Sequence, residues 1–210
     1  MTHFTINDLS QEYQYLADAS ILIIGNGPSA AKHELGREID KFDQIIRINN
    51  YVTDHMESQV GSRTDIWVNG ANQGLKKRID VPEKILVMIP PVVLNRKGET
   101  IHSRIEKRLG TSNYTLLPLE IMSEMESRCG LDRPTTGFFA IYFFYLLGFD
   151  VTLYGFDFFV GSTAHYFDSP IKRWLKDKGL IKKAAKHDVS GEKEFVETLI
   201  QKGQVKVLKA

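Results

Sequence analysis

The 210-residue sequence has one cysteine, no long apolar run and almost no net charge. The single cysteine, Cys129, excludes an internal disulfide and fits a reducing compartment. The longest apolar stretch, residues 137–147, is far shorter than the roughly 20 residues that span a bilayer. The first residues lack the basic and apolar segments of a signal peptide. These absences predict a cytoplasmic protein without a transmembrane helix.

The chain has 27 Lys and Arg residues against 26 Asp and Glu residues, which gives a net charge of +1. Bulk electrostatics therefore gives no reason to expect a nucleic-acid partner. The length and the 42% hydrophobic content are sufficient for one substantial core. We predict a single domain over residues 1–210, and the sequence leaves its oligomeric state open.

Short apolar runs alternate with helical patterns along the chain. Strands are expected at residues 21–24, 44–48, 65–68, 84–89, 114–117, 151–154 and 205–208. Helices are expected at residues 29–38, 99–109, 119–129, 136–147, 170–178 and 191–202. Residues 90–91 and 95–98 are typical of a loop because they combine prolines, polar residues and glycine. The alternation predicts an α/β fold with one Rossmann-like, doubly wound, mostly parallel sheet.

The first expected strand runs directly into Gly25-Asn26-Gly27-Pro28-Ser29. Its four branched apolar residues indicate a strand buried on both faces. The glycines allow a tight turn and a close ligand approach, and Pro28 and Ser29 suit the start of a helix. Because a helix N-terminus at the carboxyl edge of a parallel sheet attracts anions, we predict a phosphorylated ligand here.

A dinucleotide cofactor is one alternative, since Gly25-x-Gly27-x-x-Ala30 matches the loose fingerprint of such sites. That fingerprint also needs an acidic residue about 20 positions later to hold the ribose. The expected second strand ends instead in Asn49-Asn50, and an amide carries no charge. A Rossmann dinucleotide-dependent enzyme is therefore the weaker interpretation.

Residues 171–186 form a basic segment with seven Lys and Arg residues and one acid, Asp177, interleaved with Trp174 and other apolar residues. One interpretation is a solvated amphipathic helix or lid. The other is a lid that meets an anionic acceptor or a lipid surface at the inner face of the membrane. In both cases we expect a lid or acceptor-side segment at about residues 158–190.

Further motifs follow the opening turn in a fixed order. They are residues 36–40, 43, 45–49 and 60–65; then 133–137 and 151–157; then His165-Tyr166-Phe167-Asp168; and last His187-x4-Glu192. In this order they resemble the large, small, third and very small motifs of the eukaryotic-type sialyltransferases. The chain is also similar to the compact bacterial sialyltransferases, which share Gly-Asn-Gly-Pro-Ser. The resemblance runs from about residue 20 to the C-terminus.

Two features depart from these families. The eukaryotic-type enzymes join the large and small motifs by a disulfide, where this chain has Ile21 and Gly148. We interpret this as a change of compartment rather than a loss of activity. The compact bacterial enzymes hold the leaving phosphate with two tyrosines, where this chain has Phe159 and His165. The eukaryotic-type arrangement is therefore the closer match at this point.

The resemblance implies a GT-A-like variant of the fold with a basic lid region, and an inverting glycosyltransferase. It would move an acidic sugar, sialic acid or Kdo, from a CMP-activated donor to a hydroxyl of a glycan or glycolipid acceptor. Such a role suits polysaccharide or lipopolysaccharide biosynthesis. A non-catalytic CMP-sugar-binding protein is the alternative, supported by the small size and by Phe159.

Two histidines are the candidate catalytic residues. His187 is the expected general base, since imidazole titrates near neutrality. His165 is expected to donate a hydrogen bond to the leaving phosphate. Arg133 is a candidate acceptor contact or, equally, a surface ion pair. Glu192 receives no chemical step, because an acid in a first helical turn is favourable in itself.

The remaining site residues belong to the nucleotide and donor sugar. By resemblance, Asn69 would meet the donor sugar and Thr136 its carboxylate, at a predicted helix start. The full set is Gly25, Asn26, Gly27, Pro28, Ser29, Asn49, Asn69, Thr135, Thr136, Gly137, Gly155, Asp157 and Tyr166. Asp157 is not part of an Asp-x-Asp motif, and no His/Cys cluster has zinc spacing. We therefore expect no required metal or other cofactor.

Overall fold

The computed structural model describes residues 5–157, 166 and 188–210. The expected helix at residues 170–178, the basic segment at 171–186 and most of the expected lid lie outside these residues. Among the described helices, none combines the length and apolar character needed to cross a membrane.

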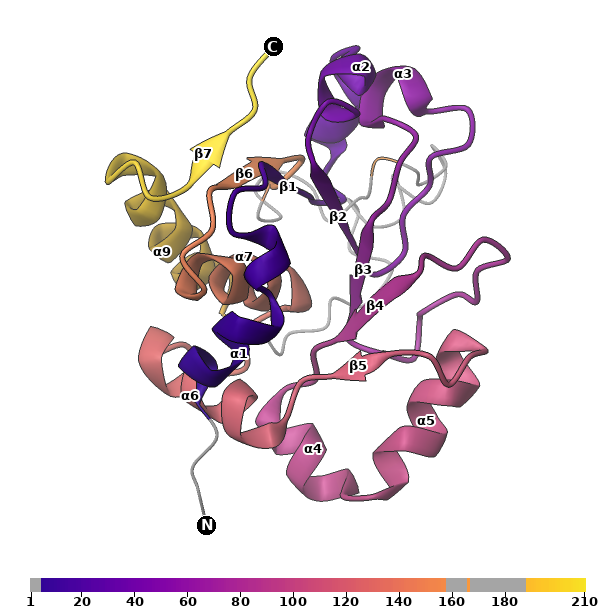
Figure 1. Cartoon of the computed structure of the whole chain (residues 1–210), viewed down its shortest axis with the longest axis vertical. Coiled ribbons are helices and arrows are strands. Elements are labelled where there is room, and N and C mark those ends of the chain that lie inside the picture. Colours follow the sequence, from indigo (N-terminus) through magenta and orange to yellow (C-terminus); the bar gives the residue numbers. More distant parts are fainter. Residues whose placement is uncertain (1–4, 158–165, 167–187) are drawn as a thin grey trace.

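A sheet of seven parallel strands forms the centre of the molecule (Figure 1). The strands are β1 (Ile21–Ile24), β2 (Gln44–Ile48), β3 (Ile66–Asn69), β4 (Lys84–Val87), β5 (Thr115–Leu116), β6 (Val151–Tyr154) and β7 (Lys206–Val207). All seven match expected strands, with ends shifted by at most two residues. The parallel α/β architecture predicted from the alternation is therefore confirmed.

The strand order is β5-β4-β3-β2-β1-β6-β7. The chain builds outward from β1 to β5 on one side and then returns to place β6 on the other side of β1. This reversal makes the carboxyl ends of β1 and β6 the switch point of the sheet, the region where open α/β sheets bind ligands. The turn at residues 25–29 follows β1 and therefore lies at this switch point.

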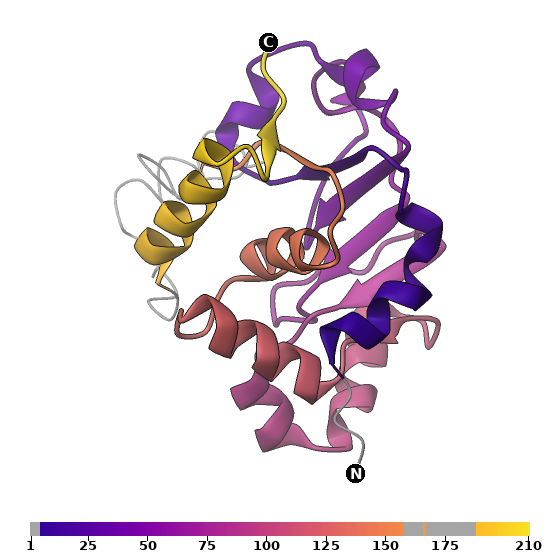
Figure 2. The ribbon, with the colours of Figure 1, turned by 60° about the vertical axis from the view of Figure 1, so that its left-hand side comes forward.

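Helices cover both faces of the sheet (Figures 1 and 2). One face packs against α7 (Thr136–Leu146), α6 (Leu119–Cys129), α5 (Thr100–Leu109), α4 (Pro91–Lys97) and α1 (Ile6–Glu12), with the 3-10 turn η1 (Gln14–Leu16). The other face packs against the 3-10 turn η2 (Pro28–Ala31), α2 (Gly36–Ile39) and α3 (Glu57–Val60). The last helix, α9 (Val189–Gln201), lies beside α7 and contributes Val196 to the larger core.

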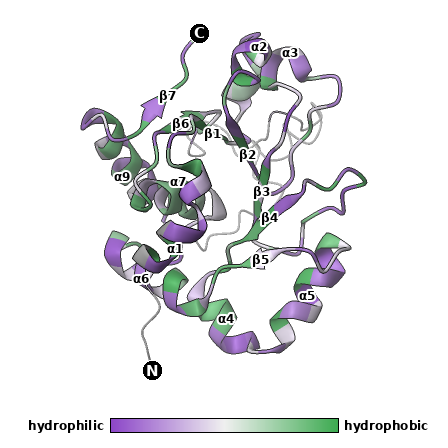
Figure 3. Ribbon diagram, viewed as in Figure 1, coloured by the Kyte–Doolittle hydropathy of each residue, from purple (hydrophilic) through white to green (hydrophobic). Residues whose placement is uncertain are grey.

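Hydropathy follows this layering (Figure 3). The strand β1 is hydrophobic along its length, whereas α5 is largely hydrophilic with a few apolar positions. Helix α7 is different, because Phe138–Phe144 are all buried. A helix that is apolar all round must be enclosed by other elements. Its position fixes where its N-terminal residues, Thr135–Gly137, meet the sheet.

Two expectations about local structure were wrong. The helix expected at residues 29–38 is instead the two short elements η2 and α2. A Cβ atom on Gly36 would lie 1.8 Å from the carbonyl oxygen of Glu57, so α2 begins where it touches α3. The loop expected at residues 90–98 is largely the helix α4. Pro91 occupies its first turn and Gly98, at φ +49°, follows its end, so both are helix-boundary signals.

Arg47 is a charged residue inside the core, on β2 and fully buried. Its Nη2 donates to the carbonyl oxygens of Val60 at 2.6 Å and Gly61 at 3.1 Å, and its Nε donates to that of Arg63 at 2.9 Å. Carbonyls at the C-terminal end of α3 carry partial negative charge. The guanidinium of Arg47 therefore links the C-terminal end of α3 to strand β2.

Candidate active site

Two glycine turns interlock at the switch point, one after β1 and one after β6. Gly25 N donates to the carbonyl oxygen of Tyr154 at 2.7 Å, and Gly27 N donates to that of Gly155 at 2.8 Å. A Cβ atom on Gly25 would lie 2.5 Å from the Gly155 oxygen, so a larger residue would force the turns apart. Gly155 has a φ of +71°, which disfavours other residues.

Asp157 holds the start of the 3-10 turn η2. Its Oδ2 accepts a hydrogen bond from Ser29 N at 2.9 Å. Pro28 occupies the first position of the turn, as expected. The expectation that a long helix would offer free amides to a phosphate here needs correction, because η2 is short and the Ser29 amide already binds a carboxylate. A phosphate at this turn must use other donors.

Asn26 and Asn49 stand at the carboxyl ends of β1 and β2 and are fixed by main-chain contacts. Asn26 Nδ2 donates to the carbonyl oxygen of Ile48 at 2.7 Å. Asn49 has a φ of +50°, and its Oδ1 accepts from Gly70 N at 3.1 Å. Within the described part of the chain, Asn26 Oδ1 and Asn49 Nδ2 make no hydrogen bond. The pair therefore offers one acceptor and one donor to a ligand.

Asn69 ends β3 and is fully buried. Its Oδ1 accepts from Ala71 N at 3.1 Å, whereas its buried Nδ2 has no hydrogen-bond partner among the described residues. A buried donor without an acceptor costs free energy, which a ligand oxygen would recover. The next residue, Gly70, lies so close to α7 that a Cβ atom would come within 2.7 Å of Thr136 Oγ1. The fold thus brings Gly70, the residue after Asn69, against Thr136.

The N-terminus of α7 faces the same edge. Thr135 caps the helix, because its Oγ1 accepts from Phe138 N at 3.2 Å. In the described ranges no group accepts a hydrogen bond from the amides of Thr136 and Gly137. Helix N-termini carry partial positive charge, so these two amides can bind an anionic group. A carboxylate placed here would lie near the turn that follows β3.

Glu192 is a buried residue of α9, in contact with the start of α7, that the sequence analysis did not assign to the site. It is only 2% exposed, and its carboxylate accepts from Thr135 N at 2.6 Å and from Thr135 Oγ1 at 2.7 Å. Helix α9 is thereby tied to the N-terminus of α7. A usable signal was present, since Glu192, Val196 and Leu199 share one face at helical spacing and the latter two are apolar.

Tyr166 joins the turns after β1 and β2. Its amide donates to the carbonyl oxygen of Asn26 at 3.1 Å, and its hydroxyl accepts from Val52 N at 2.9 Å and donates to the Val52 carbonyl. Burial raises the pKa of this phenol above its ordinary value. The hydroxyl is thus engaged with main-chain groups, so contact with a phosphate would require it to leave one of them.

Arg133 lies in the connection between α6 and α7, with a left-handed φ of +52°. Its amide donates to Glu126 Oε1 at 3.0 Å. Burial raises the pKa of Glu126, and the Arg133 hydrogen bond opposes this rise. The contact of Arg133 with an acceptor stays a prediction.

His165, His187 and Phe159 lie outside the described residues. The residues next to the two histidines in the sequence, Tyr166 and Asp188, are described. Tyr166 N donates to the carbonyl oxygen of Asn26, and Asp188 caps α9, because its Oδ1 accepts from Gly191 N at 3.0 Å. In residues 5–157, 166 and 188–210, no group of three His, Cys, Asp or Glu residues could hold a metal ion. The described part of the site combines neutral amide groups with two carboxylates, of Asp157 and Glu192, that already accept hydrogen bonds from the main chain. The amide groups suit a hydroxyl-rich ligand.

The sequence of this chain matches that of known proteins over most of its length. Residues 19–204 match the model of glycosyltransferase family 29, the sialyltransferases. A type 2 lactosamine alpha-2,3-sialyltransferase from Pan troglodytes is 24% identical over 229 aligned residues, covering 94% of this chain and 67% of the relative.

Solved structures share the fold. A mammalian sialyltransferase in complex with Gal-beta-1-3GalNAc-ortho-nitrophenol superposes with a TM-score of 0.62 at 16% identity, covering 98% of this chain and 79% of that one. The sialyltransferase CstII from Campylobacter jejuni, in complex with the substrate analogue cytidine-5'-monophosphate, gives 0.51 at 14% identity, covering 91% and 80%.

Proposed function

The chain belongs to glycosyltransferase family 29, the sialyltransferases, and on this premise we propose that it transfers sialic acid with inversion from a CMP-activated donor to a hydroxyl of a glycan acceptor. The family match carries this proposal. A dinucleotide-dependent enzyme is disfavoured by the same match and by Asn49, which stands where a ribose-binding acid is needed.

The geometry at the carboxyl edge of the sheet supports a donor of this chemistry. Among the described residues, the Nδ2 of Asn69 and the amides of Thr136 and Gly137 have no hydrogen-bond acceptor, so the first suits a sugar oxygen and the two amides suit the donor carboxylate. The amide groups of Asn26 and Asn49 suit nucleotide hydroxyls. In these assignments amides and a helix N-terminus hold the ligand, while the carboxylates of Asp157 and Glu192 hold the main chain around it.

In the proposed reaction, His187 takes the proton from the acceptor hydroxyl, and the acceptor oxygen attacks the anomeric carbon. The bond from that carbon to the phosphate oxygen breaks, and CMP leaves from the opposite face. The transition state has oxocarbenium-ion character, as in glycoside hydrolysis. His165 donates a hydrogen bond to the departing phosphate and so stabilises the charge that develops there. These steps need no metal ion.

Transfer is tested by measuring CMP release from CMP-sialic acid and from CMP-Kdo in the presence of lactose, with and without EDTA. We expect release from CMP-sialic acid that EDTA does not change. His187→Ala should lower release at least about 100-fold while CMP still raises the melting temperature. His102→Ala, on α5, is the matched control and should keep full activity. Full activity of His187→Ala would rule out the base assignment, and release that needs a metal would rule out the metal-free mechanism.

CMP-Kdo is the second donor candidate, and the assay above ranks the two. We also propose that the enzyme is cytoplasmic and that its basic segment, residues 171–186, contacts the anionic lipid surface at the inner face of the membrane. Vesicles of phosphatidylcholine with and without phosphatidylserine test this idea by co-sedimentation. Equal binding to both vesicles would contradict it.

A further inference from the structure

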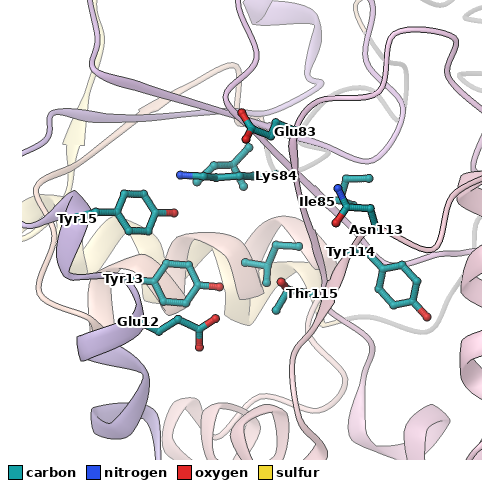
Figure 4. Close-up of a pocket in the computed structure, with 11 residues that line it drawn as sticks. Glu12, Tyr13, Tyr15, Glu83, Lys84, Ile85, Asn113, Tyr114 and Thr115 are labelled. Atoms are coloured by element: carbon teal, nitrogen blue, oxygen red, sulfur yellow. The ribbon is translucent and has the colours of Figure 1, made fainter.

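A pocket opens at the amino edge of the sheet, at the opposite end of the strands from the candidate active site. Figure 4 shows the residues that line it. The first residues of three strands, Ile66 of β3, Lys84 of β4 and Thr115 of β5, line it together with the end of α1. Its volume is about 250 Å³. Strands of four residues separate it from the carboxyl edge by about 13 Å of sheet, so it is not part of the donor site.

Tyr13 shows that this pocket has unused binding capacity. Its side chain is 7% exposed and packs edge-on against Phe143, with ring centroids 5.3 Å apart. Figure 4 shows its hydroxyl pointing toward Thr115, yet among the described residues nothing hydrogen-bonds to this hydroxyl. Burial raises the pKa of Tyr13, so the phenol stays a protonated donor at neutral pH. A hydroxyl that lines a cavity and has no hydrogen-bond partner among the described residues can donate to a ligand oxygen.

The rest of the lining defines the chemistry of that ligand. Ile66 and Ile85 provide an apolar surface, while Glu12, Glu83 and Asn113 add carboxylate and amide groups. Such a mixture suits a small ring that has both C–H faces and hydroxyl groups. The volume lies below the roughly 300–1,000 Å³ of pockets for larger ligands, which excludes a nucleotide sugar.

Charge narrows the choice further. Two carboxylates, of Glu12 and Glu83, line the pocket against one ammonium group, of Lys84, so an anionic ligand would be repelled. Lys84 Nζ already lies over the ring of Tyr15, 3.8 Å from its centroid. A cationic ligand would have to displace it from that ring. A neutral ligand avoids both conflicts.

We propose that this pocket is a non-catalytic carbohydrate-binding site that takes one neutral pyranose unit of a glycan. Tyr13 donates its hydroxyl hydrogen to a sugar oxygen, and the carboxylates of Glu12 and Glu83 accept from sugar hydroxyls. A long glycan held here would be present at a raised local concentration around the enzyme.

Nuclear magnetic resonance with 13C-labelled tyrosine rings tests the site without any donor or turnover, so its outcome is independent of the proposed transfer reaction. The chain has eight tyrosines. Methyl β-D-galactopyranoside should shift the ring signals of Tyr13 and Tyr15 in a saturable way, whereas choline and CMP should leave both unchanged. Tyr13→Phe should weaken galactoside binding about 3- to 10-fold, the effect of one hydrogen bond.

Two further variants complete the design. Tyr145→Phe removes a hydroxyl from a half-buried tyrosine of α7 outside the pocket and should bind the galactoside as the parent does. Glu12→Gln, on the exposed end of α1, should weaken binding without affecting folding. The proposal is overturned if the galactoside shifts neither signal, if choline or CMP shifts them instead, or if Tyr13→Phe and Glu12→Gln bind with unchanged affinity.

Discussion

Replacing Glu192 by glutamine keeps the shape of a buried side chain and removes its charge. In the parent protein, two short hydrogen bonds, at 2.6 and 2.7 Å, run from Thr135 to the carboxylate. Hydrogen bonds to charged groups contribute about 1.5–3 kcal/mol each, and neutral ones about 0.5–1.5 kcal/mol. The amide oxygen can still accept from Thr135 N, and the amide nitrogen can donate to Thr135 Oγ1, which reverses the second bond. Both bonds are then neutral and the desolvation cost is lower, so we expect a net loss of about 2 kcal/mol in the free energy of unfolding.

Glu192→Ala should be more damaging, because it leaves the amide and hydroxyl of Thr135 without their acceptors. Each lost partner costs about 1–3 kcal/mol, so a total near 4 kcal/mol is expected. Both variants should also raise the KM for CMP-sialic acid, because the amides of Thr136 and Gly137 follow directly after Thr135. Positioning of the donor would thus weaken together with the fold.

Urea unfolding and donor kinetics measure the two effects. Glu197→Gln is the matched control on the same helix, since Glu197 forms an exposed pair with Lys193 at 3.5 Å. A surface pair of this kind contributes about 0.5 kcal/mol or less. If Glu192→Gln lowered the unfolding free energy no more than Glu197→Gln, the argument that α9 holds the start of α7 would be refuted.

Two other perturbations follow from the same structure. Gly27→Ala would place a Cβ atom 2.5 Å from Asp157 Oδ2, so we expect a loss of about 1–3 kcal/mol in the free energy of unfolding and a smaller melting shift with CMP. Gly74→Ala, with 3.7 Å of clearance, should behave as the parent. Equal behaviour of the two variants would contradict the close packing of the turns. Burial raises the pKa of Tyr13, Tyr154 and Tyr166 in the folded state, so the unfolded chain loses these protons at a lower pH than the folded protein. The contribution of these phenols to stability is therefore fully present below pH about 10, and the free energy of unfolding should fall as the pH rises further. Urea midpoints measured between pH 8 and 11 check this, and Tyr166→Phe should reduce the fall; a midpoint that stays constant to pH 11 would show that these phenols ionise as readily in the folded protein.

The strands were predictable because each is a short apolar run between turn residues. The sequences of β1, β2 and β6 need no distant information to be identified, and their bounds agree with the expectation. Residues 91–97 were misassigned because proline and glycine mark both loops and helix ends. Their helical state depends on the packing of Leu94 into the core, which a local pattern does not reveal.

The donor side of the site was predictable in part. Turns that follow parallel strands meet at one sheet edge, so Asn26, Asn49, Asn69 and Gly155 could be grouped from the order of elements alone. The contact between Ser29 and Asp157 could not, because it joins residues 128 positions apart. Neither the motif around Ser29 nor the motif around Asp157 shows that the Asp157 carboxylate accepts a hydrogen bond from the Ser29 amide, which was expected to bind phosphate.

The sequence by itself determined the parallel α/β architecture, the glycine turn at the switch point and the family to which the chain belongs. These properties depend on local periodicity and on motif order, both of which can be read directly from the sequence. Only the tertiary structure decided which polar groups lack a hydrogen-bond partner within the described residues, among them Asn69 Nδ2 and the first amides of α7. Whether a buried group has a partner depends on the packing of segments distant in the chain, as Glu192 shows at the start of α7.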